Sequence, residues 1–104
     1  MIVEMRTYTI KPGRLHDFLK IYNDDIREVH TEILGNQLGF FYSEFGELNQ
    51  VIHIYGYDSY DERDKRRKIL SHNEAFKNYV KKAADLIFSQ KNQLLIPAEF
   101  SKIK

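Results

Sequence analysis

Apolar and polar residues alternate along two stretches of the chain, which is the pattern of strands whose two faces meet different surroundings. The first stretch covers residues 2–10 and the second covers residues 50–57. Residues 38–46 are also strand-like, and the short connection 46–49 predicts an antiparallel hairpin with residues 50–57. A last strand is expected at 93–100, where Pro97 lacks an amide donor and indicates an edge or a bulge.

The segments between the predicted strands have the periodicity of helices. From Leu15 onward, apolar residues recur in steps of three or four, which predicts one long amphipathic helix that starts after Pro12 and stops at Gly35. This stripe consists of Leu15, Phe18, Tyr22, Ile26, Val29 and Ile33.

Two capping-box spacings predict two further helices. Ser59 stands three residues before Glu62, and Ser71 stands three residues before Glu74, so we expect helices near 59–70 and 74–90. Phe76, Val80, Ala83 and Ile87 form the apolar stripe of the second one.

The order of these elements is β-α-β-β-α-β, with the second crossover split into two helices. It predicts an α+β, ferredoxin-like fold: a four-stranded antiparallel sheet with its helices on one face. The chain of 104 residues, 42% of them hydrophobic, suits a single domain spanning 1–104.

The alternation also predicts which residues share a face of the sheet, and which of the two faces the helices cover. We expect the aliphatic side of each strand under the helices, with Ile52 and Ile54 as examples. The other side would then be bare, and it is rich in aromatic and charged residues: Ile2, Glu4, Arg6, Tyr8, Ile10, Phe40, Tyr42, Glu44, Val51, His53, Tyr55 and Tyr57.

Such a face is too aromatic for open water and too polar for a dry core. A second copy laid against it would enclose a small-molecule pocket between two sheets, which predicts a homodimer and a dimeric α+β barrel. The alternative is a solvated sheet face, which some ferredoxin-like domains use to bind RNA through aromatic residues.

Charge and composition exclude several partners. The chain has 16 basic and 15 acidic residues, a net charge of +1, so no overall field attracts nucleic acid or an anionic membrane. It has no cysteine, hence no disulfide or thiolate chemistry. No targeting segment or membrane span is expected, and the predicted location is the cytoplasm.

His53 and Arg6 are the candidate catalytic residues, because an imidazole can move protons and a guanidinium can bind an anionic or carbonyl-bearing ligand. The competing interpretation is structural: acids and arginine neutralise one another, and His53 makes an internal hydrogen bond. The candidate ligand-binding residues are Glu4, Tyr8, Tyr42, Glu44, Tyr55 and Tyr57.

Other chemistry has little support. The four histidines form no metal-binding spacing, and no phosphate loop or serine elbow is present, so neither a metal nor a cofactor is predicted. The charged run 61–68 places acids four residues ahead of bases, as on a solvated helix face.

Three segments carry a resemblance to a known family: EMRTYTIKPGRL at 4–15, LGFFYSEFGELNQVIHIYGYDSYDERDKRR at 38–67, and the closing QLLIPAEF. They resemble the NIPSNAP family, whose members share an E-x-R-x-Y-x-x-x-P-G start and a G-x-L-N-x-V-x-H-x-x-x-Y centre. The matching positions are Glu4, Arg6, Tyr8, Pro12, Gly13, Gly46, Leu48, Asn49, Val51, His53 and Tyr57.

The resemblance implies the dimeric α+β-barrel fold, a group that includes small cofactor-independent monooxygenases, isomerases and haem-degrading enzymes. It names the fold better than the function. Two hypotheses follow: a pocket, catalytic or not, for an oxygenated or aromatic metabolite, and a non-catalytic assembly or scaffold module.

Overall fold

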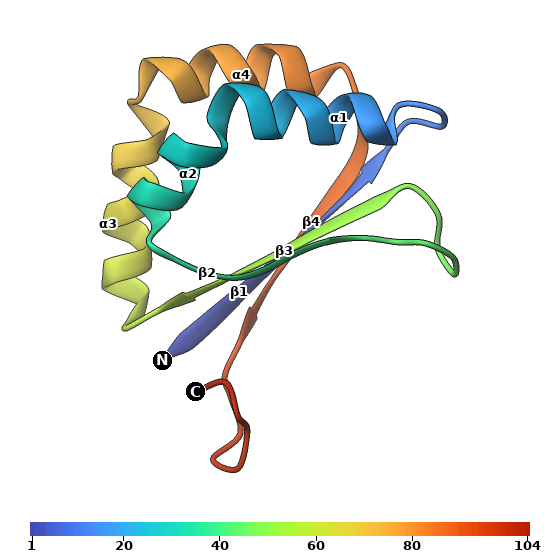
Figure 1. Ribbon diagram of the computed structural model, residues 1–104. Coiled ribbons are helices and arrows are strands. Elements are labelled where there is room, and N and C mark those ends of the chain that lie inside the picture. Colours follow the sequence, from blue (N-terminus) through green and yellow to red (C-terminus); the bar gives the residue numbers. More distant parts are fainter.

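The computed structural model describes residues 1–104 as one sheet covered on one face by helices (Figure 1). The strands pair antiparallel in the order β2-β3-β1-β4, which confirms the predicted ferredoxin-like α+β fold. None of the helices is long and apolar enough to cross a membrane. The elements are β1 (Ile2–Ile10), α1 (Leu15–Ile21), the π-helical segment η1 (Tyr22–Ile26), α2 (Arg27–Leu34), β2 (Asn36–Tyr42), β3 (Gln50–Tyr57), α3 (Tyr60–Ser71), α4 (Glu74–Ala84) and β4 (Ile87–Leu95).

The first long helix is continuous from α1 through η1 to α2, as predicted, and it ends at Gly35 with a φ of 90°. Its inward face differs from the predicted stripe, because the wider π turn delays each later residue by one position. Val29 and Ile33 are therefore only half-buried. The buried positions follow a spacing of four: Phe18, Tyr22, Ile26, His30 and Leu34.

One of the two predicted capping boxes is confirmed in its N-cap half. The Glu62 amide donates to Ser59 Oγ at 3.1 Å, where α3 begins, while the Glu62 carboxylate accepts from Arg66. The second prediction was wrong, since Ser71 ends α3 and Asn73 caps α4 by accepting from the Phe76 amide. An Asn side chain reaches the same orphan amides as a serine hydroxyl.

The bounds of the other elements also shift. β2 ends at Tyr42 rather than at residue 46, α4 ends at Ala84 rather than at residue 90, and β4 covers 87–95 rather than 93–100. β4 pairs along the whole of β1, from Val3 opposite Leu95 to Ile10 opposite Ile87. Pro97 therefore lies beyond the strand, where its missing amide costs no ladder hydrogen bond.

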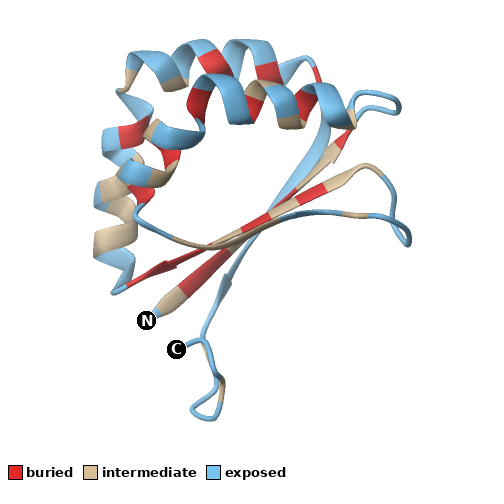
Figure 2. Cartoon of the chain, viewed as in Figure 1, coloured by how far each residue is buried: buried red, intermediate tan, exposed pale blue.

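The prediction of which sheet face the helices cover was wrong. Val51, His53, Tyr55 and Tyr57 are all buried, and His53 contacts the His30 ring of α2. Figure 2 shows buried stretches on the central strands of the sheet and on the helices that cover them. The polar side of the sheet thus lies under the helices, because the helices supply partners for its buried polar groups. No second copy is needed to cover it.

The aliphatic side of the sheet is the open one, and no helix covers it (Figure 1). Strand pairing aligns its side chains, with Met5 opposite Ile54 and Thr7 opposite Ile52. Phe41 is 55% exposed there. We call this surface the outer sheet face; its apolar residues are Val3, Met5, Leu38, Phe41, Ile52, Ile54 and Leu95.

Candidate functional site

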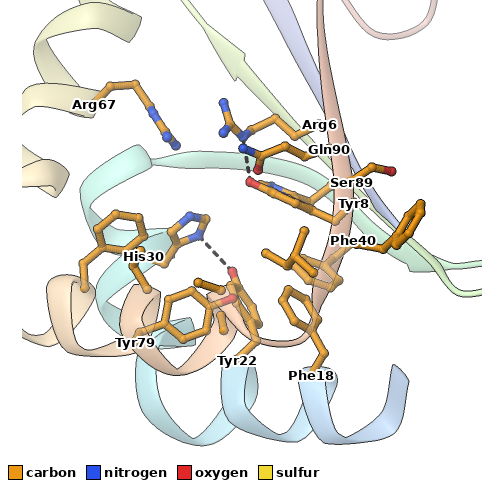
Figure 3. Close-up of a pocket in the computed structure, with 17 residues that line it drawn as sticks. Arg6, Tyr8, Phe18, Tyr22, His30, Phe40, Arg67, Tyr79, Ser89 and Gln90 are labelled. Carbon is orange, nitrogen blue, oxygen red and sulfur yellow. Dashed lines mark hydrogen bonds between the residues drawn. The ribbon is translucent and has the colours of Figure 1, made fainter. Parts of the chain in front are cut away.

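A cavity of about 410 Å³ lies between the inner face of the sheet and the helices (Figure 3). Of its 17 lining residues, 11 are hydrophobic. The arginines and His30 gather at one end, while Phe18 and Tyr79 lie at the other (Figure 3). An apolar pocket with a few convergent polar groups is the usual form of a small-molecule site.

His53 lies on the wall formed by the central strand β3 and is packed among rings. Its imidazole stacks on Tyr8, with ring centroids 5.4 Å apart, and on Phe40 at 5.5 Å. Its Nδ1 is buried without a hydrogen-bond partner. Burial, together with His30, Arg6 and Arg67, lowers the pKa of His53 to about 3, so the ring is neutral at neutral pH.

His30 joins this wall from α2. Its Nδ1 lies 2.9 Å from the hydroxyl oxygens of both Tyr22 and Tyr55, and Gln37 Nε2 donates to the Tyr55 hydroxyl. A hydroxyl oxygen can accept two hydrogen bonds, so the bond from Gln37 leaves Tyr55 able either to donate to His30 Nδ1 or to accept from it. Burial and the nearby Arg67 and Arg6 lower the His30 pKa to about 3, so the ring is neutral at neutral pH.

Arg6 and Glu4 leave the same side of β1 and belong to one charged cluster. Arg6 Nε donates to Tyr8 Oη at 3.0 Å, and its Nη1 reaches Glu4 at a long 3.4 Å. The stronger partners of Glu4 are Arg63 at 2.7 Å and Asn92 at 2.7 Å. Although burial raises the pKa of Glu4, these hydrogen bonds and the arginine charges outweigh it and hold that pKa below its usual value.

Two further arginines of α3, Arg63 and Arg67, also turn toward the sheet. They stand four residues apart, one helical turn, so they share a face. The prediction of a solvated face for residues 61–68 was therefore wrong for these two, although the surface pairs Glu62 with Arg66 and Asp64 with Lys68 do form. Arg67 lines the cavity, and burial together with Arg6 lowers its pKa.

The other predicted site residues lie in different surroundings in the structure. Tyr8 lines the cavity, whereas Tyr55 lies behind it in the His30 network. Tyr57 is buried with an unpartnered hydroxyl, outside the lining. Tyr42 is 49% exposed beside His16, and Glu44 is exposed in the β2–β3 loop.

Sequence reasoning missed His30, Arg67 and the helical aromatic residues that close the cavity. His30 follows Ile26 by four residues, so it could have been assigned to the buried face had the π turn been foreseen. Arg63 and Arg67 have the i,i+4 spacing that places them on one face of a helix, but no neighbouring residue in the sequence indicates that this face points toward the sheet. The structure brings no three histidine or acidic side chains together as a metal site would need.

Comparison with known sequences decides the family. The sequence profile of the NIPSNAP family matches residues 3–102. The chain belongs to the NIPSNAP family. The resemblance inferred from the sequence motifs is thereby confirmed.

Relatives of this NIPSNAP chain are found in eukaryotes and bacteria. It is 30% identical over 96 residues to a NipSnap homolog of Dictyostelium discoideum, covering 92% of this chain but only 42% of that protein. It is 35% identical over 71 residues to human NipSnap homolog 3A, covering 65% of this chain and 27% of that protein. The chain thus spans less than half the length of these relatives.

Solved structures agree with the NIPSNAP fold. A NIPSNAP family protein from Agrobacterium tumefaciens superposes with a TM-score of 0.96 at 36% identity, covering 99% of this chain and 98% of that one. A putative antibiotic biosynthesis monooxygenase from Nitrosomonas europaea superposes with a TM-score of 0.70 at 10% identity, covering 96% of this chain and 100% of that one. The second similarity shows a shared fold only.

The NIPSNAP motif residues occupy two places in the fold. Glu4, Arg6, Tyr8, His53 and Tyr57 all lie on the inner face, where they form or adjoin the cavity wall. Val51 is buried on the same face of β3. The remaining motif positions lie in the connections between elements, as with Gly46 and Asn49, whose φ angles are 91° and 63°.

Proposed function

We propose that this protein binds a small oxygenated or aromatic metabolite in the cavity between its sheet and its helices. The observation that carries the proposal is the cavity itself: about 410 Å³, largely apolar, with Arg6, His30, His53 and Arg67 at its wall. A pocket of this size and composition suits a metabolite held by a few polar contacts. Each chain would hold its own ligand.

Binding has firmer physical support than catalysis. A histidine with a pKa of about 3 is a weak base at neutral pH, and a general base works best when its pKa lies near the working pH. His53 and Arg6 remain the candidate catalytic residues of an enzymatic version. A ligand that carries negative charge to the His53 ring would raise its pKa and restore its ability to exchange protons.

The pocket can be tested with a small-fragment library read out by protein-observed NMR and thermal stability. Ala84 is exposed on α4 and lines the cavity, so Ala84→Trp is expected to fill the cavity without disturbing the core. Hits should lose binding to Ala84→Trp and keep it with Ala75→Trp, an exposed position on the same helix outside the lining. Hits that bind both variants equally would place the ligand elsewhere and refute the proposal.

We further propose that two chains associate through the outer sheet face. An exposed apolar sheet face is unusual for a monomer. Four strands about 4.8 Å apart and about 30 Å long present roughly 600 Å², near the roughly 800 Å² per partner of a stable interface. Sedimentation velocity across a concentration series tests the dimer, and a chain that stays monomeric at high concentration would refute it.

The assembly or scaffold hypothesis stays as the second candidate, because the outer sheet face supports association whether or not a ligand binds. It predicts a dimer in sedimentation with no fragment sensitive to Ala84→Trp. A dimer whose pocket binds fragments favours the first proposal instead.

A further inference from the structure

Arg67 is a half-buried cation that the folded chain leaves without a directly paired carboxylate. No hydrogen bond or ion pair joins its guanidinium to another side chain; burial and the charge of Arg6 lower its pKa, and the charge of Glu4 opposes this more weakly. Figure 3 shows the guanidinium ends of Arg67 and Arg6 turned toward one another at the same end of the cavity. Two like charges held together away from water are unfavourable unless something neutralises them.

The charged side chains at this end of the cavity include more cations than carboxylates. Three guanidinium groups, those of Arg6, Arg63 and Arg67, lie beneath the helices. The buried carboxylate that pairs with them is Glu4, shared by Arg6 and Arg63. Asp64 lies 3.9 Å from Arg63 but only 3.4 Å from Lys68, so its charge is shared with a cation at the surface. Arg67, which lines the cavity, has no carboxylate partner.

Neutral polar groups surround the same place. His30 Nε2 makes no hydrogen bond within the chain, and in Figure 3 the ring edge opposite the Tyr22 bond faces the arginines. Gln90 lines the cavity next to Arg6. An acceptor with two oxygen atoms could bind this set, because guanidinium groups bind carboxylates through paired, charge-assisted hydrogen bonds.

The rest of the cavity favours an apolar body on the ligand. Phe18, Phe76 and Tyr79 present rings to it, while Ala83 and Ile87 present aliphatic surface. Flat or chain-like hydrocarbon would bury well against this lining.

Resting on the proposed pocket function, we propose that the ligand is a monocarboxylate with an aromatic or apolar body, whose carboxylate is held between Arg67 and Arg6. Arg67 is the ligand's main charge partner, because Arg6 already shares Glu4.

The test uses matched pairs of acids and amides: benzoate, 3-phenylpropanoate and hexanoate against benzamide, 3-phenylpropanamide and hexanamide. Titrations by calorimetry and NMR compare the wild type with Arg67→Gln, and with Lys65→Gln as control. Lys65 is exposed on the same helix, so its loss removes the same charge away from the cavity. The acids should bind the wild type more tightly than the amides, and Arg67→Gln should weaken the acids by about ten- to a hundredfold.

The Arg67→Gln protein without ligand should unfold at the same or higher urea concentration than the wild type, since the substitution relieves repulsion with Arg6. Strong destabilisation instead would assign Arg67 a structural role and overturn the inference. Amides that bind as tightly as acids and are blocked by Ala84→Trp would also overturn it while leaving the pocket in place. If Ala84→Trp blocks neither series, the pocket proposal itself fails.

Discussion

At the scale of single residues, Glu4 is the main acid that neutralises the arginines under the helices. It is 3% exposed and accepts hydrogen bonds from Arg63 and Asn92 at 2.7 Å each. We expect Glu4→Gln to lower the free energy of unfolding at pH 7 by about 3 kcal/mol, because it leaves Arg63 without its buried partner. Urea denaturation measures this, with Glu74→Gln, an acid in an exposed ion pair, expected to cost at most about 0.5 kcal/mol.

The effect of Glu4 should depend on pH. Because its pKa is lower in the folded chain than the ordinary 4.5, its stabilisation is present above pH 4.5 and disappears as the pH falls through the folded value. The stability gap between the wild type and Glu4→Gln should therefore narrow below pH 4. A gap that stays constant down to acid unfolding would contradict this account.

His53 should make its own contribution to the pH dependence of stability. Its folded pKa of about 3 lies below the unfolded 6.5, so between these values the unfolded chain binds a proton that the native chain does not. Stability should fall with acid in that window, by about 1.4 kcal/mol per pH unit for this histidine. The charged neighbours Arg6 and Arg67 act in the same direction, while Glu4 opposes them weakly.

His53→Phe tests this contribution. Phenylalanine fits among the surrounding rings and removes the unpartnered Nδ1, so we expect no loss of stability at pH 7 and a shallower decline from pH 6.5 to 5. Urea denaturation at several pH values gives both quantities, with His16→Phe, an exposed site, as control. A decline as steep as that of the wild type would rule out a neutral buried His53.

At the scale of elements, the π turn decides which residues of the first helix reach the cavity. Buried residues in the helix are spaced by four, whereas a regular helix advances about 100° per residue and would turn such a series steadily away from the sheet. Segment η1 absorbs this drift between Tyr22 and Ile26. It thereby aligns His30 with Tyr22, which the hydrogen bond between them requires.

Deleting Asp24 should convert η1 to regular helix. Asp24 is exposed, and its removal changes the buried spacing to the three-and-four pattern of an ordinary helix, so we expect a folded protein with modest loss of stability. Deleting the exposed Glu32 within α2 should cost more, because it turns the buried Leu34 about 100° away from the core. Circular dichroism and urea denaturation compare the two; equal losses would contradict the role given to η1.

Element order, and most strand and helix positions, could be predicted because they depend on local periodicity and caps such as Ser59. The orientation of the sheet could not. Alternation along β3 shows that His53 and Tyr55 share a face, but the neighbouring residues His30 and Arg67 lie on helices, and only the tertiary fold brings them to that face. The same holds for the π turn, which only tertiary packing reveals.

At the scale of the whole molecule, the two faces of the sheet have separate roles. The inner face and the helices of the chain form the walls of a cavity, whereas the outer sheet face is apolar and open. Under the original expectation, a pocket between two sheets, loss of the dimer would abolish binding. From the structure we expect the opposite: a monomer should still bind a ligand in its pocket.

The variant Ile54→Lys distinguishes a pocket that needs the partner chain from a pocket that a monomer keeps. It places a charge at the centre of the outer sheet face, opposite Met5, and should shift sedimentation velocity toward the monomer. Asn78→Lys, which adds the same charge at an exposed position on α4, should leave the association unchanged. Because no outer-face side chain lines the cavity, monomeric Ile54→Lys should bind a cavity fragment with a Kd within about twofold of the wild type. Binding lost together with the dimer, in a variant that still unfolds cooperatively, would mean that the partner chain completes the pocket.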